Sequence, residues 1–437
     1  MTVPDGAAPA RPGVAGRETA AGRRAAAGQS RVRHAPRAAA LGVRALAAIL
    51  LAGCGAVPAA TPGAAPARAA QPSLVTALTV PGGTSWAVVE MGGSRSQHNN
   101  FWQLVTRPAG SARWALATPP GVADNGGLVA APLGGPALVA GFNPSQDLTF
   151  SPLATTRDRG AHWTPGLLPA GLAGVPSALA AGPGGKLIAL TRRDEAELSA
   201  PGGAVWKRLA SLASVAATPA GRSCGLTGLT AAGFTSAGAP LLAGRCARPG
   251  IAGIFSYAGG SWQLAGPAMT AALARSQISV VQLTRAGTGI TALLTAAGPG
   301  GTASLVAAWA GRNGRWELSV PLPLRGSRIL ATASGTPPGA GLTVSAARSG
   351  LPGAVGVILS TGRAEYITGS AGTWQRLPAL PAHAAGLVLG PGPRISVLAA
   401  SGSILTGWRL AVRHASRAAG WTRTQTMKVP VPYESSG

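Results

Sequence analysis

Short runs of apolar residues recur along the chain, and glycine closely precedes each of them. The runs show no helical periodicity and are bounded by glycine, proline and serine. Such runs predict β-strands, and glycine supplies the positive φ that a tight hairpin turn needs. The pattern therefore predicts an all-β protein. The predicted strands are residues 86–89, 137–140, 187–190, 241–243, 290–294, 342–344 and 395–398.

Tryptophans repeat in register with these strands, and most of them end a glycine-rich or polar turn. A period near 50 residues, with several strands in each unit, is typical of β-propeller blades. We predict a β-propeller of seven blades over residues 74–431, with six or eight blades as alternatives, and a C-terminal tail at 432–437. The competing interpretation is a β-sandwich or solenoid with incidental tryptophans. The repeated tryptophans are Trp114, Trp163, Trp206, Trp262, Trp316, Trp374 and Trp421.

Residues 1–53 have the pattern of an export signal. An arginine-rich segment precedes the apolar run 45–51, which is too short to span a bilayer, since a spanning helix needs about 20 residues. A basic region, a short apolar region and small residues at a cleavage point are typical of secretory signals. An uncleaved anchor or a chance alanine and leucine stretch is the alternative.

Leu51, Ala52, Gly53 and Cys54 resemble the lipobox of bacterial lipoproteins. The resemblance implies cleavage before Cys54 and acylation of its thiol, which would anchor the protein to the outer face of the bacterial cell membrane. Two or three acyl chains hold a protein at a membrane far more firmly than one. Residues 54–73, rich in alanine, proline and glycine, are expected to form a flexible tether. The basic region is longer than is usual in that family, which leaves the true start codon open.

The chain carries a formal charge of +25, and removal of residues 1–53, with eight arginines and two acids, leaves +19. A basic surface attracts anionic lipid headgroups and polymers. We therefore expect a lipid-anchored monomer whose partner is an unidentified protein or an anionic envelope polymer. A GC-rich genome would also enrich arginine. Because the arginines are scattered singly and no binding motif accompanies them, we expect no nucleic-acid partner.

Thr156, Asp158, Gly160 and Trp163 match the Asp-box pattern Ser/Thr-x-Asp-x-Gly-x-x-Trp. The match resembles the BNR repeat of sialidase-like propellers, in which the box is a structural hairpin away from the active site. We expect Asp158 to accept hydrogen bonds from backbone N–H groups, and Trp163 to pack over the next strand. Later copies of the box are eroded.

Sialidase chemistry, as the resemblance implies it, needs three arginines, a tyrosine–glutamate pair and an aspartate acid. Glu365 and Tyr366 are adjacent, so in a strand their side chains point to opposite faces. The acidic run 194–197 is interpreted as a solvated loop rather than a metal site. The histidines are isolated from one another in the sequence, and we expect them to be surface residues rather than ligands. We find no zinc spacing, nucleophile elbow or phosphate loop. The sequence therefore predicts no catalytic residue, metal or cofactor, and it leaves enzyme activity uncertain but not expected.

Cys224 and Cys246 are a pair in a chain predicted to be exported, which suggests a disulfide. They flank the hairpin predicted at Gly238, so we expect them to face each other on antiparallel strands. Two buried or reactive thiols are the alternative.

The function that these observations favour is a membrane-anchored binding or scaffold module outside the cytoplasm. A diverged exo-sialidase-like glycoside hydrolase is one alternative. A membrane-complex assembly factor, as in the related photosystem-assembly propellers, is another.

Overall fold

The computed structural model divides the 437-residue chain into two compact units, Met1–Ala65 and Pro66–Gly437. All residues that it describes belong to the second unit. The predicted export signal, Cys54 and the tether lie outside them. The described residues are 75–79, 84–92, 100–120, 122, 127–134, 136–142, 153–165, 176–191, 193–201, 205–286, 289–311, 313–335, 353–368, 373–390, 395–411 and 420–430.

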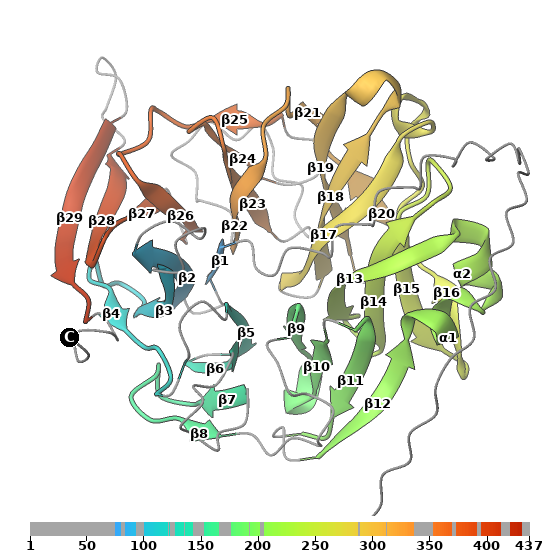
Figure 1. Ribbon diagram of the computed structural model, residues 1–437, viewed down its shortest axis with the longest axis horizontal. Coiled ribbons are helices and arrows are strands. Elements are labelled where there is room, and N and C mark those ends of the chain that lie inside the picture. The colour runs from blue at the N-terminus through green and yellow to red at the C-terminus, as the bar shows by residue number, and fades with distance from the viewer. Residues whose placement is uncertain are drawn as a thin grey trace, which may run out of the picture. The chain divides into compact units, whose positions relative to one another are not determined.

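Antiparallel strands make up most of this unit, and the described strands pair mainly in seven groups of four consecutive strands (Figure 1). β21 (Leu322–Pro323) pairs additionally with β19. The groups are β1 (Val75–Thr79), β2 (Ser85–Gly92), β3 (Asn100–Arg107) and β4 (Ala115–Leu116); β5 (Leu128–Gly134), β6 (Ala137–Phe142), β7 (Leu153–Thr156) and β8 (Thr164–Pro165); β9 (Ala178–Ala181), β10 (Leu187–Leu190), β11 (Glu195–Ser199) and β12 (Trp206–Ser211); β13 (Leu226–Phe234), β14 (Pro240–Cys246), β15 (Gly253–Ala258) and β16 (Ser261–Leu264); β17 (Gln277–Ala286), β18 (Gly289–Ala297), β19 (Ala303–Ala310) and β20 (Trp316–Leu318); β22 (Ile329–Gly335), β23 (Ala354–Leu359), β24 (Ala364–Thr368) and β25 (Gln375–Arg376); and β26 (Ala384–Leu389), β27 (Ile395–Ser401), β28 (Ile404–Ala411) and β29 (Gly420–Lys428).

The first strand of each group lies against the first strand of the next group. These contacts run from β1 through β5, β9, β13, β17, β22 and β26, and β26 returns to contact β1. A closed circuit of antiparallel groups is the arrangement of a β-propeller, in which neighbouring blades bury each other's faces. The predicted all-β propeller is therefore confirmed.

The number of blades stays a prediction, because the first and sixth groups share one sheet and the fourth and fifth groups share another. β1 pairs antiparallel with β2 and in parallel with β22, where Ala77 lies opposite Ala333. The C-terminal strand β29 does not pair with β1. Both edges of β1 already carry hydrogen-bonded neighbours, and β29 pairs with β28 instead.

The glycine-preceded apolar runs form the second strand of six groups. They lie in β2, β6, β10, β14, β18 and β27, whereas the predicted run 342–344 is outside the described residues. All four residues of β10 are buried, as expected for a strand covered on both faces. Gly238 adopts a φ of 83° in the turn that joins β13 to β14, a conformation that a residue with a Cβ rarely takes.

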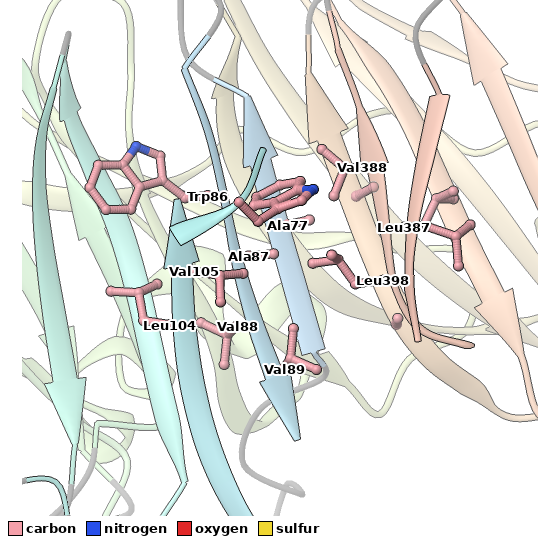
Figure 2. Packing of buried hydrophobic residues seen from close by; sticks show 14 of the residues in the cluster. Ala77, Trp86, Ala87, Val88, Val89, Leu104, Val105, Leu387, Val388 and Leu398 are labelled. Atoms are coloured by element: carbon pink, nitrogen blue, oxygen red, sulfur yellow. The ribbon is translucent and has the colours of Figure 1, made fainter. Parts of the chain in front are cut away.

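The largest hydrophobic cluster joins the first group to the last (Figure 2). Trp86 of β2 and Leu104 of β3 belong to the same cluster as Leu387 of β26 and Leu398 of β27, and each is at most 1% exposed. Burial of one such aliphatic side chain contributes about 1.5–3 kcal/mol. These two groups, which are far apart in the sequence, therefore share one core.

The repeated tryptophans mark the fourth strand of every group. Four of them lie in β12, β16, β20 and β29, and the other three directly precede β4, β8 and β25. Three indoles reach back to the preceding group. Their Nε1 atoms donate to backbone carbonyls three or four residues beyond the previous tryptophan, which ties the sequence period to contacts between groups. The pairs are Trp316 to Ala265 (2.6 Å), Trp374 to Val320 (3.0 Å) and Trp421 to Pro378 (3.5 Å).

Two short α-helices, α1 (Leu212–Ala216) and α2 (Pro219–Cys224), connect the third group to the fourth. Ser211 and Thr218 begin them, and each side chain accepts a hydrogen bond from a backbone N–H of the first turn. The 3-10 helices are η2 (Pro183–Gly185), η3 (Ala271–Leu273) and η4 (Pro299–Gly301). Within the described part of the chain, no helix has the length and apolar character needed to cross a membrane.

Candidate functional site

A small polar pocket lies where the first group meets the last. Its volume is about 60 Å³. Two of its lining residues are arginines, three carry hydroxyl groups, and none is a carboxylate. The lining residues are Arg107, Gly110, Ser111, Ala112, Ser396, Arg409 and Thr424.

Arg107 ends β3, and its side chain is held firmly in the wall of the pocket. The residue is 8% exposed. Nη1 donates to Ser396 Oγ at 2.8 Å, and Nη2 donates to Ser85 Oγ at 3.3 Å. The guanidinium also lies 4.8 Å from the centre of the Trp114 ring, within the range of a cation–π interaction. These contacts offset part of the cost of burying the charge and fix its position.

The last group supplies the opposite wall. Ser396 of β27 and Arg409 of β28 are cross-strand partners, so their side chains share one face of the sheet. Ser396 Oγ accepts a hydrogen bond from Arg107, which leaves its own O–H proton to be donated elsewhere. Arg409 is exposed to solvent.

Local irregularities place the two remaining hydroxyl groups. The register of β28 and β29 shifts at Gly407, which leaves Thr424 as the additional residue of a bulge. Bulges redirect side chains, and here Thr424 Oγ1 donates to the Gly407 carbonyl at 3.1 Å. After β3, Gly110 adopts a φ of 77°, and the turn that it permits brings Ser111 to the pocket.

Trp114 connects the two groups that form the pocket. Its backbone N–H donates to Gln425 Oε1 at 2.7 Å, and Gln425 Nε2 donates to the Trp114 carbonyl at 3.0 Å. A Cβ placed on Gly407 would lie 3.3 Å from the indole ring, so glycine lets β28 approach this tryptophan closely. The pocket is therefore built on a fixed contact between the two groups.

The innermost strands carry few charges. Across the described residues of β1, β5, β9, β13, β17, β22 and β26, the one charged side chain is that of Arg285. The constellation of arginines, tyrosine and glutamate that sialidase chemistry needs is thus not assembled on these strands.

Glu365 and Tyr366 lie on β24, the third strand of its group, and their side chains have different partners. Glu365 Oε1 accepts hydrogen bonds from Arg363 Nη2 at 2.7 Å and from Arg376 Nε at 3.2 Å. The Tyr366 hydroxyl donates to Gln375 Oε1. Burial raises the pKa of Tyr366, which keeps its hydroxyl protonated at neutral pH. The two residues therefore do not form a nucleophile–base pair.

The Asp-box forms a tight hydrogen-bonded hairpin after β7. Thr156 Oγ1 donates to Asp158 Oδ1 at 2.9 Å and accepts from the Gly160 N–H at 2.8 Å. Asp158 Oδ1 accepts from the backbone N–H of His162 at 2.9 Å, and Oδ2 lies 2.6 Å from His162 Nδ1. These bonds from His162, the backbone bond first, lower the pKa of Asp158 to about 2. His162 is an exposed residue whose ring contacts this aspartate.

The box also touches the preceding group. Gly160 has a φ of 87°, and a Cβ added there would lie 2.5 Å from Ala117 Cβ. Trp163 packs against the core that the first and last groups share. The box acts as a structural contact between groups, and none of its four residues lines the pocket.

The acidic run 194–197 is not the predicted solvated loop, because most of it forms strand β11. Asp194 Oδ1 accepts from the Leu229 N–H at 3.2 Å, and Glu195 pairs with Arg208 at 2.9 Å. Glu197 is buried, and desolvation raises the pKa of its carboxyl group. Among the described residues, no group of histidine, cysteine and acidic side chains is arranged to hold a metal ion.

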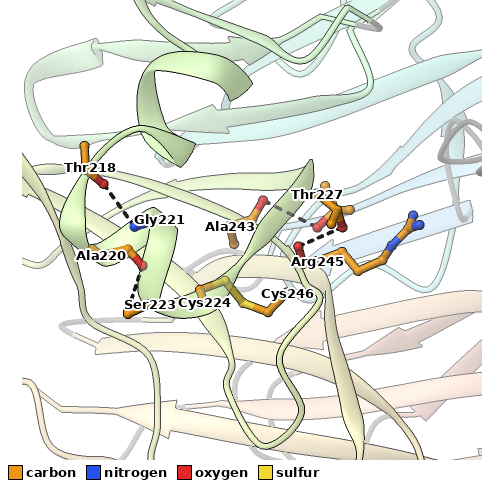
Figure 3. Close-up of a disulfide and its surroundings, with 10 residues drawn as sticks. Thr218, Ala220, Gly221, Ser223, Cys224, Thr227, Ala243, Arg245 and Cys246 are labelled. Carbon is orange, nitrogen blue, oxygen red and sulfur yellow. Dashed lines mark hydrogen bonds between the residues drawn. A yellow bond between two sulfur atoms is a disulfide. The ribbon is translucent and has the colours of Figure 1, made fainter.

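Cys224 and Cys246 are joined in the structure, with Cα atoms 5.1 Å apart (Figure 3). Cys224 ends α2 rather than lying on a strand, so the expected placement on two facing strands is wrong. The reason is that the chain before β13 turns into a helix, in which Thr218 caps the N–H of Gly221 at 3.0 Å. Both cysteines are fully buried.

Sequence reasoning missed the arginine pocket. Arg107 and Ser396 are 289 positions apart, and each looks like an isolated polar residue at the end or in the middle of a strand. No local motif connects them. The one available signal was the predicted ring closure, which brings the first and last groups together but does not specify which residues meet.

Comparison with known proteins yields similarities at the level of structure. No protein-family model and no curated protein matches this sequence. YCF48 from Cyanidioschyzon merolae is 15% identical, with a TM-score of 0.43, over 74% of this chain and 92% of that chain. YCF48 bound to D1 peptide is 14% identical, with a TM-score of 0.43, over 79% and 95%. A protein from Lactobacillus plantarum is 10% identical, with a TM-score of 0.46, over 79% and 97%. At such low identities and TM-scores, these similarities carry no argument about what this chain binds.

Proposed function

We propose that the chain is a binding or scaffold module, held at the outer face of the bacterial cell membrane by a lipid on Cys54. In this proposal a protein or an anionic envelope polymer engages the pocket between the first and last groups. The single observation that carries the proposal is the pocket itself, in which Arg107 and Arg409 converge from two groups without a lining carboxylate.

Two further features support binding rather than catalysis. The described innermost strands are almost free of charged side chains, and Glu365 and Tyr366 are engaged with separate partners. The charge of the chain favours the encounter with an anionic partner, because a net charge of this size creates a long-range attractive field.

The binding test uses the full-length chain in a neutral detergent. Anionic envelope polymers and detergent-extracted membrane proteins from the producing bacterium are immobilised separately, and binding is measured at fixed ionic strength. We expect one of the two to bind the wild type, and Arg409→Ala to weaken that binding by about tenfold, the loss of one charge-assisted contact. Arg248→Ala is the matched control, because Arg248 is exposed and does not line the pocket.

Equal binding by wild type and Arg409→Ala would contradict a role for the pocket. Specific hydrolysis of a sialoside or another glycan by the wild type would contradict the non-enzymatic part of the proposal and favour the diverged hydrolase.

The anchor has a separate test. Cells that express the wild type or Cys54→Ala are labelled with an alkyne fatty acid and then fractionated. We expect label and membrane association in the wild type, and loss of the label in the variant. A wild-type protein without label would refute the lipid anchor and leave the binding proposal standing.

A further inference from the structure

We propose that the pocket binds one oxyanion, a phosphate or carboxylate group of the ligand. This inference rests on the proposed function, because it names the chemistry that the same site recognises. Guanidinium groups and hydroxyl donors are the side chains that proteins use for these two anions.

The last group supplies two donors to the pocket. Arg409 is exposed and lies opposite Ser396 on the neighbouring strand. Because Ser396 Oγ already accepts from Arg107, its O–H proton is the part of the group that a ligand can use. A bound oxyanion would thus meet a hydroxyl donor and the charge of Arg409 from the last group.

Arg107 supplies positive charge in a fixed position. Its contacts with Ser85, Ser396 and the face of Trp114 hold the guanidinium before any ligand arrives. A group that is already ordered loses little conformational freedom on binding. Its burial also reduces screening by water, which strengthens its interaction with an anion.

The lining favours an anion over a neutral sugar. A sugar hydroxyl both donates and accepts, and a carboxylate or carboxamide oxygen is a strong acceptor for the proton that it donates. None of the seven lining residues carries such a group. The volume of about 60 Å³ is several times what one water molecule needs and suits a group of a few heavy atoms.

Calorimetric titration of the full-length chain in neutral detergent tests this inference. The probes are inorganic phosphate and acetate, each at the same ionic strength in a chloride background. We expect at least one probe to bind the wild type and Arg248→Ala equally. We expect Arg409→Ala and Ser396→Ala to weaken that binding by about tenfold or more, since hydrogen bonds to charged groups are the strong ones.

The same variants are then titrated with vesicles of neutral phospholipid with and without phosphatidic acid. Binding that depends on Arg409 for the vesicles would identify a lipid headgroup as the source of the phosphate. Binding of the soluble probes alone would identify a group on a soluble or polymeric ligand. Thermal unfolding of each variant shows that it is folded.

The inference is overturned if neither probe binds, or if each binds all four proteins equally, which would indicate an adventitious ion only. Its failure is distinct from failure of the proposed function. An envelope ligand that needs Arg409 but is not displaced by phosphate or acetate would overturn the inference alone. Probe binding without any envelope ligand would overturn the proposed function alone.

Discussion

Removal of the disulfide between Cys224 and Cys246 is expected to destabilise the protein by about 3 kcal/mol. The two residues are 22 positions apart. In the chain-entropy account, removing the cross-link of a loop of that size gives the unfolded chain more conformational entropy, which lowers the free energy of the unfolded state by about 3 kcal/mol. Both cysteines are fully buried, so we choose Cys224→Ala with Cys246→Ala, which leaves no buried hydroxyl. A Cβ placed on Gly253 would lie 2.7 Å from Cys246 Sγ, so the backbone of this glycine packs directly against the bond.

Urea unfolding of the full-length chain, followed by far-ultraviolet circular dichroism, measures the effect. We expect the double variant and the reduced wild type to unfold at similar, lower urea concentrations, whereas the oxidised wild type unfolds later. Ser223→Ala is the matched control, because it changes an exposed neighbour on the same helix and should cost no more than about 0.5 kcal/mol. A double variant within about 1 kcal/mol of the oxidised wild type would refute the entropic reasoning.

Three further predictions concern contacts between groups and the Asp-box hairpin. Trp316→Phe keeps an aromatic ring but removes the 2.6 Å hydrogen bond to the preceding group, so we expect the free energy of unfolding, measured in urea, to fall by about 1 kcal/mol. Trp421→Phe removes a 3.5 Å hydrogen bond and should lower it by less, and the reverse order would contradict the role of the indole N–H. Gly160→Ala should lower the free energy of unfolding by more than about 1 kcal/mol, because it combines a positive φ with a clash, and an unchanged urea midpoint would refute this. The folded-state pKa of Asp158 is about 2, below its ordinary 3.8, so the stability that its carboxylate contributes is present above about pH 4 and is lost as the pH falls towards 2. Asp158→Asn should lack this acid-dependent loss of stability, and identical pH profiles of stability for the variant and the wild type would refute the prediction.

The fold can be predicted from the sequence because two local features recur in register, the glycine before each apolar run and the repeated tryptophan. Glycine before an apolar run specifies a turn and a covered strand, as β10 shows, and a tryptophan such as Trp316 specifies a contact with the preceding group. Both signals are local and repeat, so their spacing indicates a propeller without any knowledge of which side chains meet.

The pocket could not be predicted in this way, because it depends on contacts between residues that are far apart in the sequence. Arg107 reaches Ser396 because two groups at opposite ends of the propeller sequence become neighbours, and Thr424 faces the pocket because of a one-residue bulge. Register shifts depend on packing across the whole interface, which no single segment encodes. The interpretation of the acidic run 194–197 as a loop is wrong for a different reason. The run pairs with both neighbouring strands of its own group, and Glu197 lies opposite Ala189 of β10 and Arg208 of β12.

Three of the tryptophans donate their hydrogen bonds to the group that precedes them in the sequence. During synthesis from the N-terminus, the groups that the indoles of Trp316, Trp374 and Trp421 contact are made before these tryptophans. Trp114 is different, because its partner Gln425 is made 311 residues later. The first group can therefore complete this contact only after the last group has been made, and the arginine pocket requires both groups. Ligand binding at that pocket would report that the ring has closed.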